Sequence, residues 1–403
     1  MRHHAFSSLP LVALLLALSP AALASNIWYV DGVHGNDNNN CKSRQTACKT
    51  IGHAISLASS DDSIIVATAI YKETLTINFS LKIVGSNART TIIDGSGYGN
   101  VVYVPTSSAR VGLSKLTIRN GAGIANSGTL TVSYSTIKGN SAYAGGGISN
   151  SGTMTLNRCT VSGNMSVGID GYYSNAGGID NEGMLTINDS TISENSTDGN
   201  YVCGGGIYST GTLIINNSTL TNNHANGASN SNGGGIDNEG GTVVLSNSTL
   251  SGNSATIYGG DGYGGGIANG GCVMSPWHPS TVTLPNSIAV TLQNSIVANS
   301  KGGNCYGAIT SMGYNLSSDN TCHFRSAGDL NNTDPKLGYL RNNGGPTQTR
   351  ALLPGSPAID AGDPSGCTDS KGHLLKSDQR GMPRPDKEDS SGCDMGAFER
   401  QKD

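Results

Sequence analysis

The stretch that decides the fold lies in the middle of the chain, where the sequence repeats itself. Residues 145–164 read GGGISNSGTMTLNRCTVSGN, and residues 177–195 read GGIDNEGMLTINDSTISEN. The shared unit begins with Gly-Gly-Ile-x-Asn-x-Gly. Its Ile recurs at near-regular intervals, at Ile124, Ile148, Ile179, Ile207, Ile236 and Ile267. Self-similarity with such a period is typical of a solenoid, in which equivalent residues of consecutive units stack in columns.

Within each unit, apolar and polar residues alternate, as in Leu130-Thr131-Val132 and Leu185-Thr186-Ile187. Alternation with a period of two predicts strands that bury one face, and no helical periodicity is present in the repeats. Turn-forming Gly, Asn and Ser separate the short strands of a unit. The sequence therefore predicts an all-β fold, a parallel β-helix whose coils lie about 4.8 Å apart.

Polar residues also recur at fixed places in the unit. Two sets of Asn would form columns at corners, where Asn tolerates a left-handed turn and its amide can bond to the Asn above and below. The first set is Asn126, Asn150, Asn181, Asn238 and Asn269, and the second is Asn140, Asn164, Asn195, Asn223 and Asn253. A third column holds Ser, with Cys159 in the place of one Ser. We therefore predict that Cys159 is an unpaired thiol inside the stack.

The composition excludes several classes of protein. Of 403 residues, 57 are Gly, only 13% are charged, and the net charge is −4. A helical bundle or coiled coil would instead be rich in Ala, Glu, Lys and Leu. No run of Lys or Arg indicates a phosphate-binding surface, so we expect no nucleic-acid partner. We also expect a monomer. No membrane span is expected, because no apolar run is long enough to cross a bilayer.

The chain divides into four predicted parts. Residues 1–24 are expected to be a signal peptide, with Arg2 before the apolar run 9–18 and cleavage after Ala24. Residues 25–122 would hold the N-terminal cap and the first coils, and residues 49–58 (KTIGHAISLA) predict a short capping helix. Residues 123–299 are the repeats, and residues 300–403 form an irregular C-terminal domain. Export predicts a secreted, extracellular or cell-surface protein.

Nine cysteines suit an exported protein, because disulfides persist outside the cytosol. Three pairs bracket short irregular segments, and we predict disulfides between Cys41 and Cys48, Cys305 and Cys322, and Cys367 and Cys393. Cys203 and Cys272 could pair through loops, although two coils separate their repeats. No CxxC pair exists, which argues against a zinc or redox motif.

The N-terminal segments 28–31 (WYVD), 50–55 (TIGHAI) and 70–73 (IYKE), together with the repeats, resemble secreted proteins of the pectin-lyase-like superfamily. This resemblance implies a right-handed parallel β-helix. The repeats are also similar to those of polymorphic outer-membrane proteins, with aliphatic residues where that family favours Phe. The catalytic segments expected from pectin methylesterases and polygalacturonases are not found, so the resemblance implies fold and export without a settled activity.

The C-terminal segments 334–338 (DPKLG), 344–347 (GGPT), 353–362 (LPGSPAIDAG), 378–381 (DQRG) and 394–399 (DMGAFE) resemble the choice-of-anchor Q domain. That domain belongs to bacterial surface proteins. The resemblance therefore implies a bacterial extracellular protein, and it places residues 300–403 in a domain of this kind.

The best candidate site is acidic. Asp180, Glu182, Asp237 and Glu239 stand in two copies of Gly-Gly-Ile-Asp-Asn-Glu-Gly, and the two-residue spacing would put each pair on the outer face of a strand. The pairs would lie two coils apart, roughly 9–10 Å. Carboxyl groups at such separations can catalyse inverting glycoside hydrolysis. Alternatively, Asp180 and Asp237 could bind calcium, or the four acids could be solvated surface charges.

Aromatic residues near these acids suit carbohydrate binding. Tyr208 would lie between Asp180 and Asp237, and Tyr172 and Tyr173 stand in a nearby insert. We therefore expect an extracellular interaction module for glycan or envelope material, with a polysaccharide-degrading hydrolase or lyase as the alternative. No cofactor is expected except possible calcium. Rows of Thr on one strand face make ice binding a remote third hypothesis.

Overall fold

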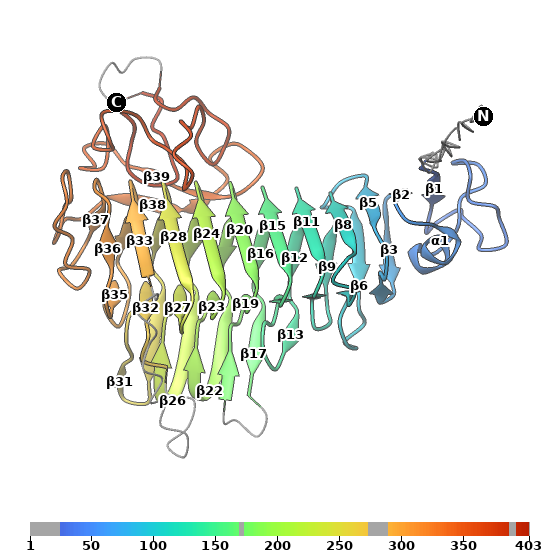
Figure 1. Ribbon diagram of the computed structural model, residues 1–403, viewed down its shortest axis with the longest axis horizontal. Helices are drawn as coiled ribbons and strands as arrows, with labels where there is room; N and C mark the ends of the chain where they lie inside the picture. The colour runs from blue at the N-terminus through green and yellow to red at the C-terminus, as the bar shows by residue number, and fades with distance from the viewer. Residues whose placement is uncertain (1–24, 169–172, 273–288, 387–391, 403) are drawn as a thin grey trace, which may run out of the picture.

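The computed structural model describes residues 25–168, 173–272, 289–386 and 392–402. Within them the chain winds into a long solenoid built from three parallel sheets, which we call A, B and C (Figure 1). Each complete coil contributes one strand to each sheet, and the coils at the two ends are incomplete. The predicted parallel β-helix is therefore confirmed by the strand pairing.

Sheet A has eleven described strands: β1 (Ile27–Val30), β2 (Asp62–Val66), β5 (Leu81–Gly85), β8 (Arg110–Ser114), β11 (Thr129–Ser133), β15 (Thr153–Asn157), β20 (Met184–Asn188), β24 (Thr212–Asn216), β28 (Thr242–Ser246), β33 (Ala289–Gln293) and β36 (Thr310–Ser311). Sheet B has ten: β3 (Ala69–Lys72), β6 (Thr91–Asp94), β9 (Thr117–Arg119), β12 (Thr136–Lys138), β16 (Thr160–Ser162), β21 (Thr191–Ser193), β25 (Thr219–Thr221), β29 (Thr249–Ser251), β34 (Ile296–Ala298) and β37 (Leu316–Ser317). Sheet C has nine: β4 (Leu75–Thr76), β7 (Val102–Val104), β10 (Ile124–Asn126), β14 (Ile148–Asn150), β19 (Ile179–Asn181), β23 (Ile207–Ser209), β27 (Ile236–Asn238), β32 (Ile267–Asn269) and β35 (Cys305–Tyr306).

A fourth sheet, sheet D, comes from the inserts between sheets B and C. Its strands are β13 (Ser141–Ala142), β17 (Met165–Val167), β18 (Tyr173–Asn175), β22 (Ser196–Cys203), β26 (His224–Asn232), β30 (Ser254–Ile257) and β31 (Gly260–Asp261). The repeat did not predict this sheet, because the inserts differ in length and have no common pattern. Figure 1 shows it as the lower part of the solenoid.

The core follows from the alternation in each strand. In one coil, Ile124, Leu130, Val132 and Ile137 point inward, and each is completely buried. Burying one Leu or Ile side chain contributes about 1.5–3 kcal/mol, and the column repeats this contribution at every coil. The predicted register is also observed, since Ile148 pairs with Ile179, Ile179 with Ile207, and Ile207 with Ile236.

The two predicted Asn columns form hydrogen-bonded ladders. At one corner, Asn126 donates to Asn150 (2.8 Å) and Asn150 donates to Asn181 (2.8 Å). At the other, the side chains of Asn164, Asn195 and Asn223 are linked by bonds of 2.9 Å. These amides are buried, so each bond satisfies a polar group that would otherwise be stranded in the core.

The N-terminal end is closed as predicted by a short helix, α1 (Ile51–Leu57). Thr50 caps it by accepting a hydrogen bond from the backbone N–H of His53. Glu73 accepts hydrogen bonds from the N–H groups of Ile51 (2.9 Å) and Gly52 (2.8 Å), and thereby fixes the helix to the first coils. Ile51 and Ala54 bury the apolar face of the helix against the end of the stack.

The solenoid extends beyond the predicted boundary at residues 299/300. Strands β35, β36 and β37 add a further coil, which sequence analysis had assigned to the C-terminal domain. The remaining chain includes an antiparallel pair, β38 (Leu337–Arg341) and β39 (Thr349–Leu352). The boundary was misplaced because this last coil lacks the Gly-Gly-Ile signature.

The C-terminal segment lies along the side of the middle coils and does not extend the stack (Figure 1). It covers the outer Thr row of sheet B. Thr219 donates to the side-chain oxygen of Gln379 (2.6 Å), and Thr249 accepts from the N–H of Ala397 (3.0 Å). A fully buried ion pair between Arg384 and Glu399 (2.7 Å) holds the segment itself together. Contacts between residues so distant in sequence could not be read from the repeat.

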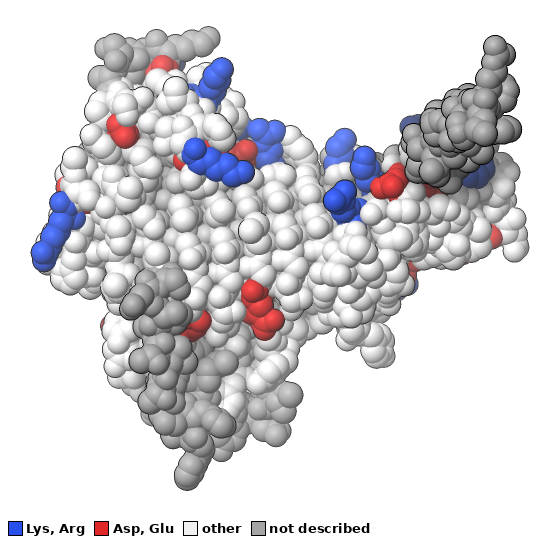
Figure 2. Space-filling model, viewed as in Figure 1, with Lys and Arg blue, Asp and Glu red and all other residues white. Residues whose placement is uncertain are grey.

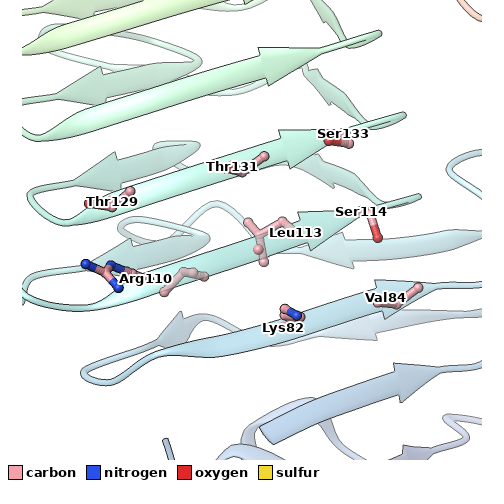
Figure 3. Close-up of a pocket in the computed structure, with 10 residues that line it drawn as sticks. Lys82, Val84, Arg110, Leu113, Ser114, Thr129, Thr131 and Ser133 are labelled. Atoms are coloured by element: carbon pink, nitrogen blue, oxygen red, sulfur yellow. The ribbon is translucent and has the colours of Figure 1, made fainter. Parts of the chain in front are cut away.

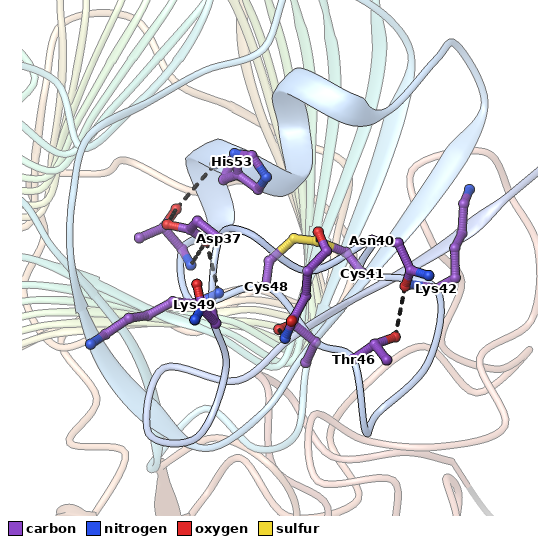
Figure 4. The surroundings of a disulfide bond; sticks show 12 residues. Asp37, Asn40, Cys41, Lys42, Thr46, Cys48, Lys49 and His53 are labelled. Carbon is purple, nitrogen blue, oxygen red and sulfur yellow. Dashed lines mark hydrogen bonds between the residues drawn. A yellow bond between two sulfur atoms is a disulfide. The ribbon is translucent and has the colours of Figure 1, made fainter.

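The three predicted disulfides are present, and Cys203 is also bonded to Cys272. In Figure 4 the Cys41–Cys48 bond ties the loop that precedes α1, and Asp37 accepts from the backbone N–H of Lys49 (2.8 Å). Cys159 is unpaired and buried, as predicted from its place in the Ser column. Burial raises the pKa of its thiol to about 12, so it is an unreactive core residue.

The ladder predicts a large effect for Asn195→Ala. Asn195 donates to the carbonyl of Val161 (3.0 Å) and to Asn223, and it accepts from the N–H of Asn164 (3.1 Å). Removing the amide leaves buried partners unsatisfied, so the free energy of unfolding should fall by about 3 kcal/mol. The measurement is urea denaturation followed by circular dichroism.

The matched control for this prediction is Asn200→Ala. Asn200 is partly exposed in β22, and its side chain has no hydrogen-bond partner within the described ranges. This variant should unfold within about 0.5 kcal/mol of the parent protein. Equal losses in both variants would show that the ladder does not stabilise the stack.

Candidate functional site

The predicted acidic column exists in the expected register. Asp180 pairs with Tyr208, and Tyr208 pairs with Asp237, on the consecutive strands β19, β23 and β27 of sheet C. Each is the middle residue of a three-residue strand whose flanking residues, such as Ile179 and Asn181, point into the core. The middle side chains therefore point out of the solenoid, as the alternation of a strand requires.

The column is nevertheless covered, which the sequence did not predict. The exposed fraction is 8% for Asp180, 6% for Tyr208 and 0% for Asp237. Tyr208 belongs to a buried cluster with Ala176 and the Cys203–Cys272 pair, contributed by the inserts next to sheet C. The interpretation of Asp180 and Asp237 as solvated surface charges is therefore wrong. The ring of Tyr208 packs against protein and is not open for stacking on a sugar.

Burial changes the acidity of the two aspartates. Loss of hydration, with a smaller contribution from the charge of Glu182, raises the pKa of Asp180 to about 7. Loss of hydration and the charge of Glu239 raise the pKa of Asp237 well above its ordinary value. Within the described chain, neither oxygen of Asp237 has a hydrogen-bond partner. Burial therefore favours the protonated form of Asp237, and Asp180, with a pKa of about 7, changes charge near neutral pH.

Glu182 and Glu239 also differ in how far they are buried. Glu182 is exposed, whereas Glu239 is partly covered and accepts a hydrogen bond from the backbone N–H of Cys272 (2.6 Å). Burial raises the pKa of Glu239, and the bond from Cys272 opposes that rise. The four acids therefore form two unequal pairs: Asp180 with Glu182 reaches the surface, and Asp237 with Glu239 lies under the disulfide.

The possible metal ligands and the tyrosines predicted to bind carbohydrate do not form one site with the four acids. Asp237 lies within 4.8 Å of the sulfur atoms of Cys203 and Cys272, but these sulfurs are bonded to each other and are not thiolate ligands. Calcium binding by Asp180 and Asp237 stays a prediction. Tyr173 stacks on Tyr201 of the next coil, with ring centres 5.4 Å apart. Tyr172 lies outside the described residues.

Sequence analysis missed a groove on the outer face of sheet A, which we call the sheet A groove (Figure 3). Its volume is about 420 Å³, and it crosses β5, β8 and β11. Gly112 creates it, because the register places this glycine between Lys82 and Thr131, where later coils have a side chain. The lining residues are Lys82, Val84, Arg110, Val111, Gly112, Leu113, Ser114, Thr129, Thr131 and Ser133.

A second depression, the corner groove, continues around the turn between sheets A and B. Lys115 and Tyr134 line it and directly follow strands of the sheet A groove, and Gly345 and Pro346 of the C-terminal segment bound it. Tyr134 is 44% exposed, and the guanidinium of Arg158 lies over its ring, 5.6 Å from the ring centre. Arg158 donates to the Tyr134 hydroxyl and pairs with Asp189 of the next coil (3.4 Å). The volume of the corner groove is also about 420 Å³.

One sequence signal could have revealed these grooves. The coils before the repeats have Gly112 in the outward column that is Thr131, Thr155 and Thr186 later in the chain. A glycine in a column that faces outward has no side chain to cover that part of the sheet, so a depression forms in the outer surface. The signal was overlooked because these early coils do not carry the Gly-Gly-Ile motif from which the columns were aligned.

Comparisons with known proteins give no family. No protein-family model matches the sequence, and no curated protein matches it. Among solved structures, the chain is similar to pectate lyase Pel9A, with 16% identity, coverage of 94% of this chain and 98% of that one, and a TM-score of 0.49. It is also similar to a rhamnogalacturonan lyase (12% identity, coverage 82% and 96%, TM-score 0.38). A third is the GH136 lacto-N-biosidase from Eubacterium ramulus (10% identity, coverage 72% and 64%, TM-score 0.38).

The structure adds one finding on membranes. In the part of the chain that is described, no helix has both the length and the apolar character needed to cross a bilayer.

The buried acid Asp237 predicts a pH-dependent stability. Its pKa is higher in the folded protein than in the unfolded chain, so above about pH 4 the unfolded chain releases a proton that the folded protein retains. The contribution of Asp237 to the free energy of unfolding therefore falls as pH rises. Asp237→Asn cannot ionise, so its stability relative to the parent protein should rise by about 1 kcal/mol or more between pH 4 and pH 8.

Urea denaturation at both pH values measures this difference. The control is Glu194→Gln, which removes an exposed carboxylate and should show no such trend. A difference between Asp237→Asn and the parent protein that is the same at pH 4 and pH 8 would contradict the burial of an ionisable carboxyl group.

Proposed function

We propose that this protein is an extracellular glycan-binding module and that the sheet A groove and the corner groove together form its binding site. The observation that supports the proposal is an open groove in a rigid parallel sheet, lined by hydroxyl groups and ending at an exposed aromatic ring. The parallel β-helix, the disulfides and the lack of a membrane-spanning helix in the described chain fit an exported protein.

The chemistry of the groove suits a sugar chain. Thr129, Thr131 and Ser133 present hydroxyl groups along one strand, and such groups can both donate and accept hydrogen bonds. Tyr134 follows them; Arg158 lies over one side of its ring, and the part of the ring that stays exposed can pack against a sugar ring. These side chains are carried by strands paired on both sides, so little conformational freedom remains to be lost when a ligand binds.

A second candidate function is polysaccharide hydrolysis at Asp180 and Glu182. A proton donor works best when its pKa is close to the working pH, and burial brings Asp180 to about 7. Glu182 lies beside it and is exposed, and two carboxyl groups in unlike environments are the arrangement of glycoside hydrolases. In this function Asp180 would protonate the leaving oxygen, and Glu182 would activate water or attack the sugar.

The proposal also covers the place of the protein in the cell. A signal peptide at residues 1–24 would direct export, and the C-terminal segment would act as a choice-of-anchor Q domain at a bacterial surface. Its dense contacts with sheet B support a role as an integral part of the solenoid and not as a separately mobile module.

Tyr134→Ala tests the binding site. A glycan array first identifies bound oligosaccharides, and isothermal titration then measures their affinity for the variant. Loss of one stacked ring should weaken binding about fivefold, because an aromatic contact contributes on the order of 1 kcal/mol. The control is Tyr98→Ala, which removes a tyrosine that is 78% exposed and lines neither groove. Unchanged affinity for Tyr134→Ala would exclude this site.

Asp180→Asn and Glu182→Gln test hydrolysis. The parent protein is incubated with neutral and acidic polysaccharides, and release of reducing ends is measured. If hydrolysis is the function, each substitution should lower the rate by at least about a hundredfold, because proton transfer by a positioned carboxyl group contributes 10²–10⁴. The control Glu194→Gln should retain the parent rate. No release from any substrate by the parent protein would exclude this candidate.

A further inference from the structure

Positive charge is concentrated at the two grooves. Lys82 and Arg110 line the sheet A groove, and Arg89, Lys115 and Arg158 line the corner groove. No Asp or Glu lines either groove. The chain as a whole has 24 Lys and Arg against 28 Asp and Glu, so this local excess of cations runs against the overall charge of −4.

Four of these cations are free of ion pairs in the part of the chain that the structure describes. Arg158 pairs with Asp189, but within the described ranges Lys82, Arg89, Arg110 and Lys115 form no ion pair. All four side chains are exposed. They therefore add little to the stability of the solenoid and remain available to an external anion.

Figure 2 shows the setting of this charge. Most of the face in view is white, and blue side chains lie on its upper part between the N-terminal coils and the C-terminal segment, some of them beside red ones. An excess of cations on a surface with few charges raises the local concentration of an anion there. The linings of the two grooves, which include cations and no described Asp or Glu, therefore mark where such an anion would bind.

We propose that the two grooves bind a polysaccharide whose sugar units carry carboxylate or sulfate groups. This inference rests on the proposed glycan-binding function and names its ligand class. Lys82 and Arg110 lie on neighbouring coils and two residues apart along the strands, so roughly 8 Å separates their Cα positions. Two anionic groups on one sugar chain can reach both cations, while the hydroxyl groups of Thr129 and Thr131 bind the neutral part of the chain.

A polysaccharide fits this site better than a nucleic acid. Proteins that bind single strands use several aromatic side chains on which successive bases stack, and the grooves provide one, Tyr134. Four hydroxyl-bearing residues, Ser114, Thr129, Thr131 and Ser133, line the sheet A groove instead. The negative charge of the rest of the protein also opposes a long, densely charged polymer.

The experiment compares three polymers that share one neutral backbone: dextran, carboxymethyl-dextran and dextran sulfate of matched length. Binding to the full mature protein is measured by biolayer interferometry at low and moderate salt. We expect the acidic polymers to bind at least about tenfold more tightly than dextran, and we expect added salt to weaken only the acidic binding. Preference between carboxymethyl-dextran and dextran sulfate identifies the anionic group.

The double variant Lys82→Ala/Arg110→Ala should reduce the affinity for acidic dextran about tenfold and leave binding to dextran unchanged. The matched control is Arg325→Ala/Lys371→Ala, which removes the same charge from exposed positions outside both grooves and should bind as the parent protein does. Equal losses in the two double variants would overturn the proposal, because net charge and not the groove would then explain the binding.

Other outcomes separate this inference from the proposed function. Dextran bound as tightly as its acidic derivatives would overturn the acidic ligand class and leave glycan binding intact. No binding to any of the three polymers, together with an empty glycan array, would overturn both. Single-stranded DNA that displaces dextran sulfate at equal charge concentration would overturn selection of a polysaccharide.

Discussion

Hydrogen bonds between equivalent side chains on consecutive coils are the constraint on which this structure depends. Most of the buried Asn side chains of the ladders bond to the Asn of a neighbouring coil, so the corner residue of one coil restricts what the next coil can carry. A shift of one residue in any strand would turn its Ile or Leu outward and break both ladders. Insertions are therefore accepted only where the chain leaves the stack, as it does between sheets B and C and again between β32 of sheet C and β33 of sheet A.

This constraint explains which parts of the fold could be predicted. The pairing of Ile179 with Ile207, the free thiol of Cys159 and the helix at residues 51–57 all follow from columns or local periodicity. Contacts outside the columns could not be predicted. The packing of Gln379 against Thr219 joins residues from unrelated parts of the chain, and no periodic signal marks it. The additional coil at residues 305–317 was missed for the same reason, because it lacks the motif.

The candidate site shows the same division. The register of Asp180, Tyr208 and Asp237 was correct because it depends on the repeat alone. The prediction that these side chains are exposed to solvent was wrong, because their exposure depends on the inserts. The irregular sequences of the inserts did not indicate that the disulfide between Cys203 and Cys272 would lie next to this column. The result is a solenoid with two unlike faces. Sheet C buries Asp237 beside a disulfide, whereas sheet A leaves hydroxyl groups and cations open to solvent.

The lateral position of the C-terminal segment has a consequence for how the protein is made. During synthesis the early coils emerge first and can stack as they appear, whereas residues 347–399 are made near the end. Until then the hydroxyls of Thr191, Thr219 and Thr249 face water. A nascent or truncated chain would therefore display an uncovered row that the finished molecule hides, and a chaperone or protease could use that row to distinguish incomplete chains from complete ones.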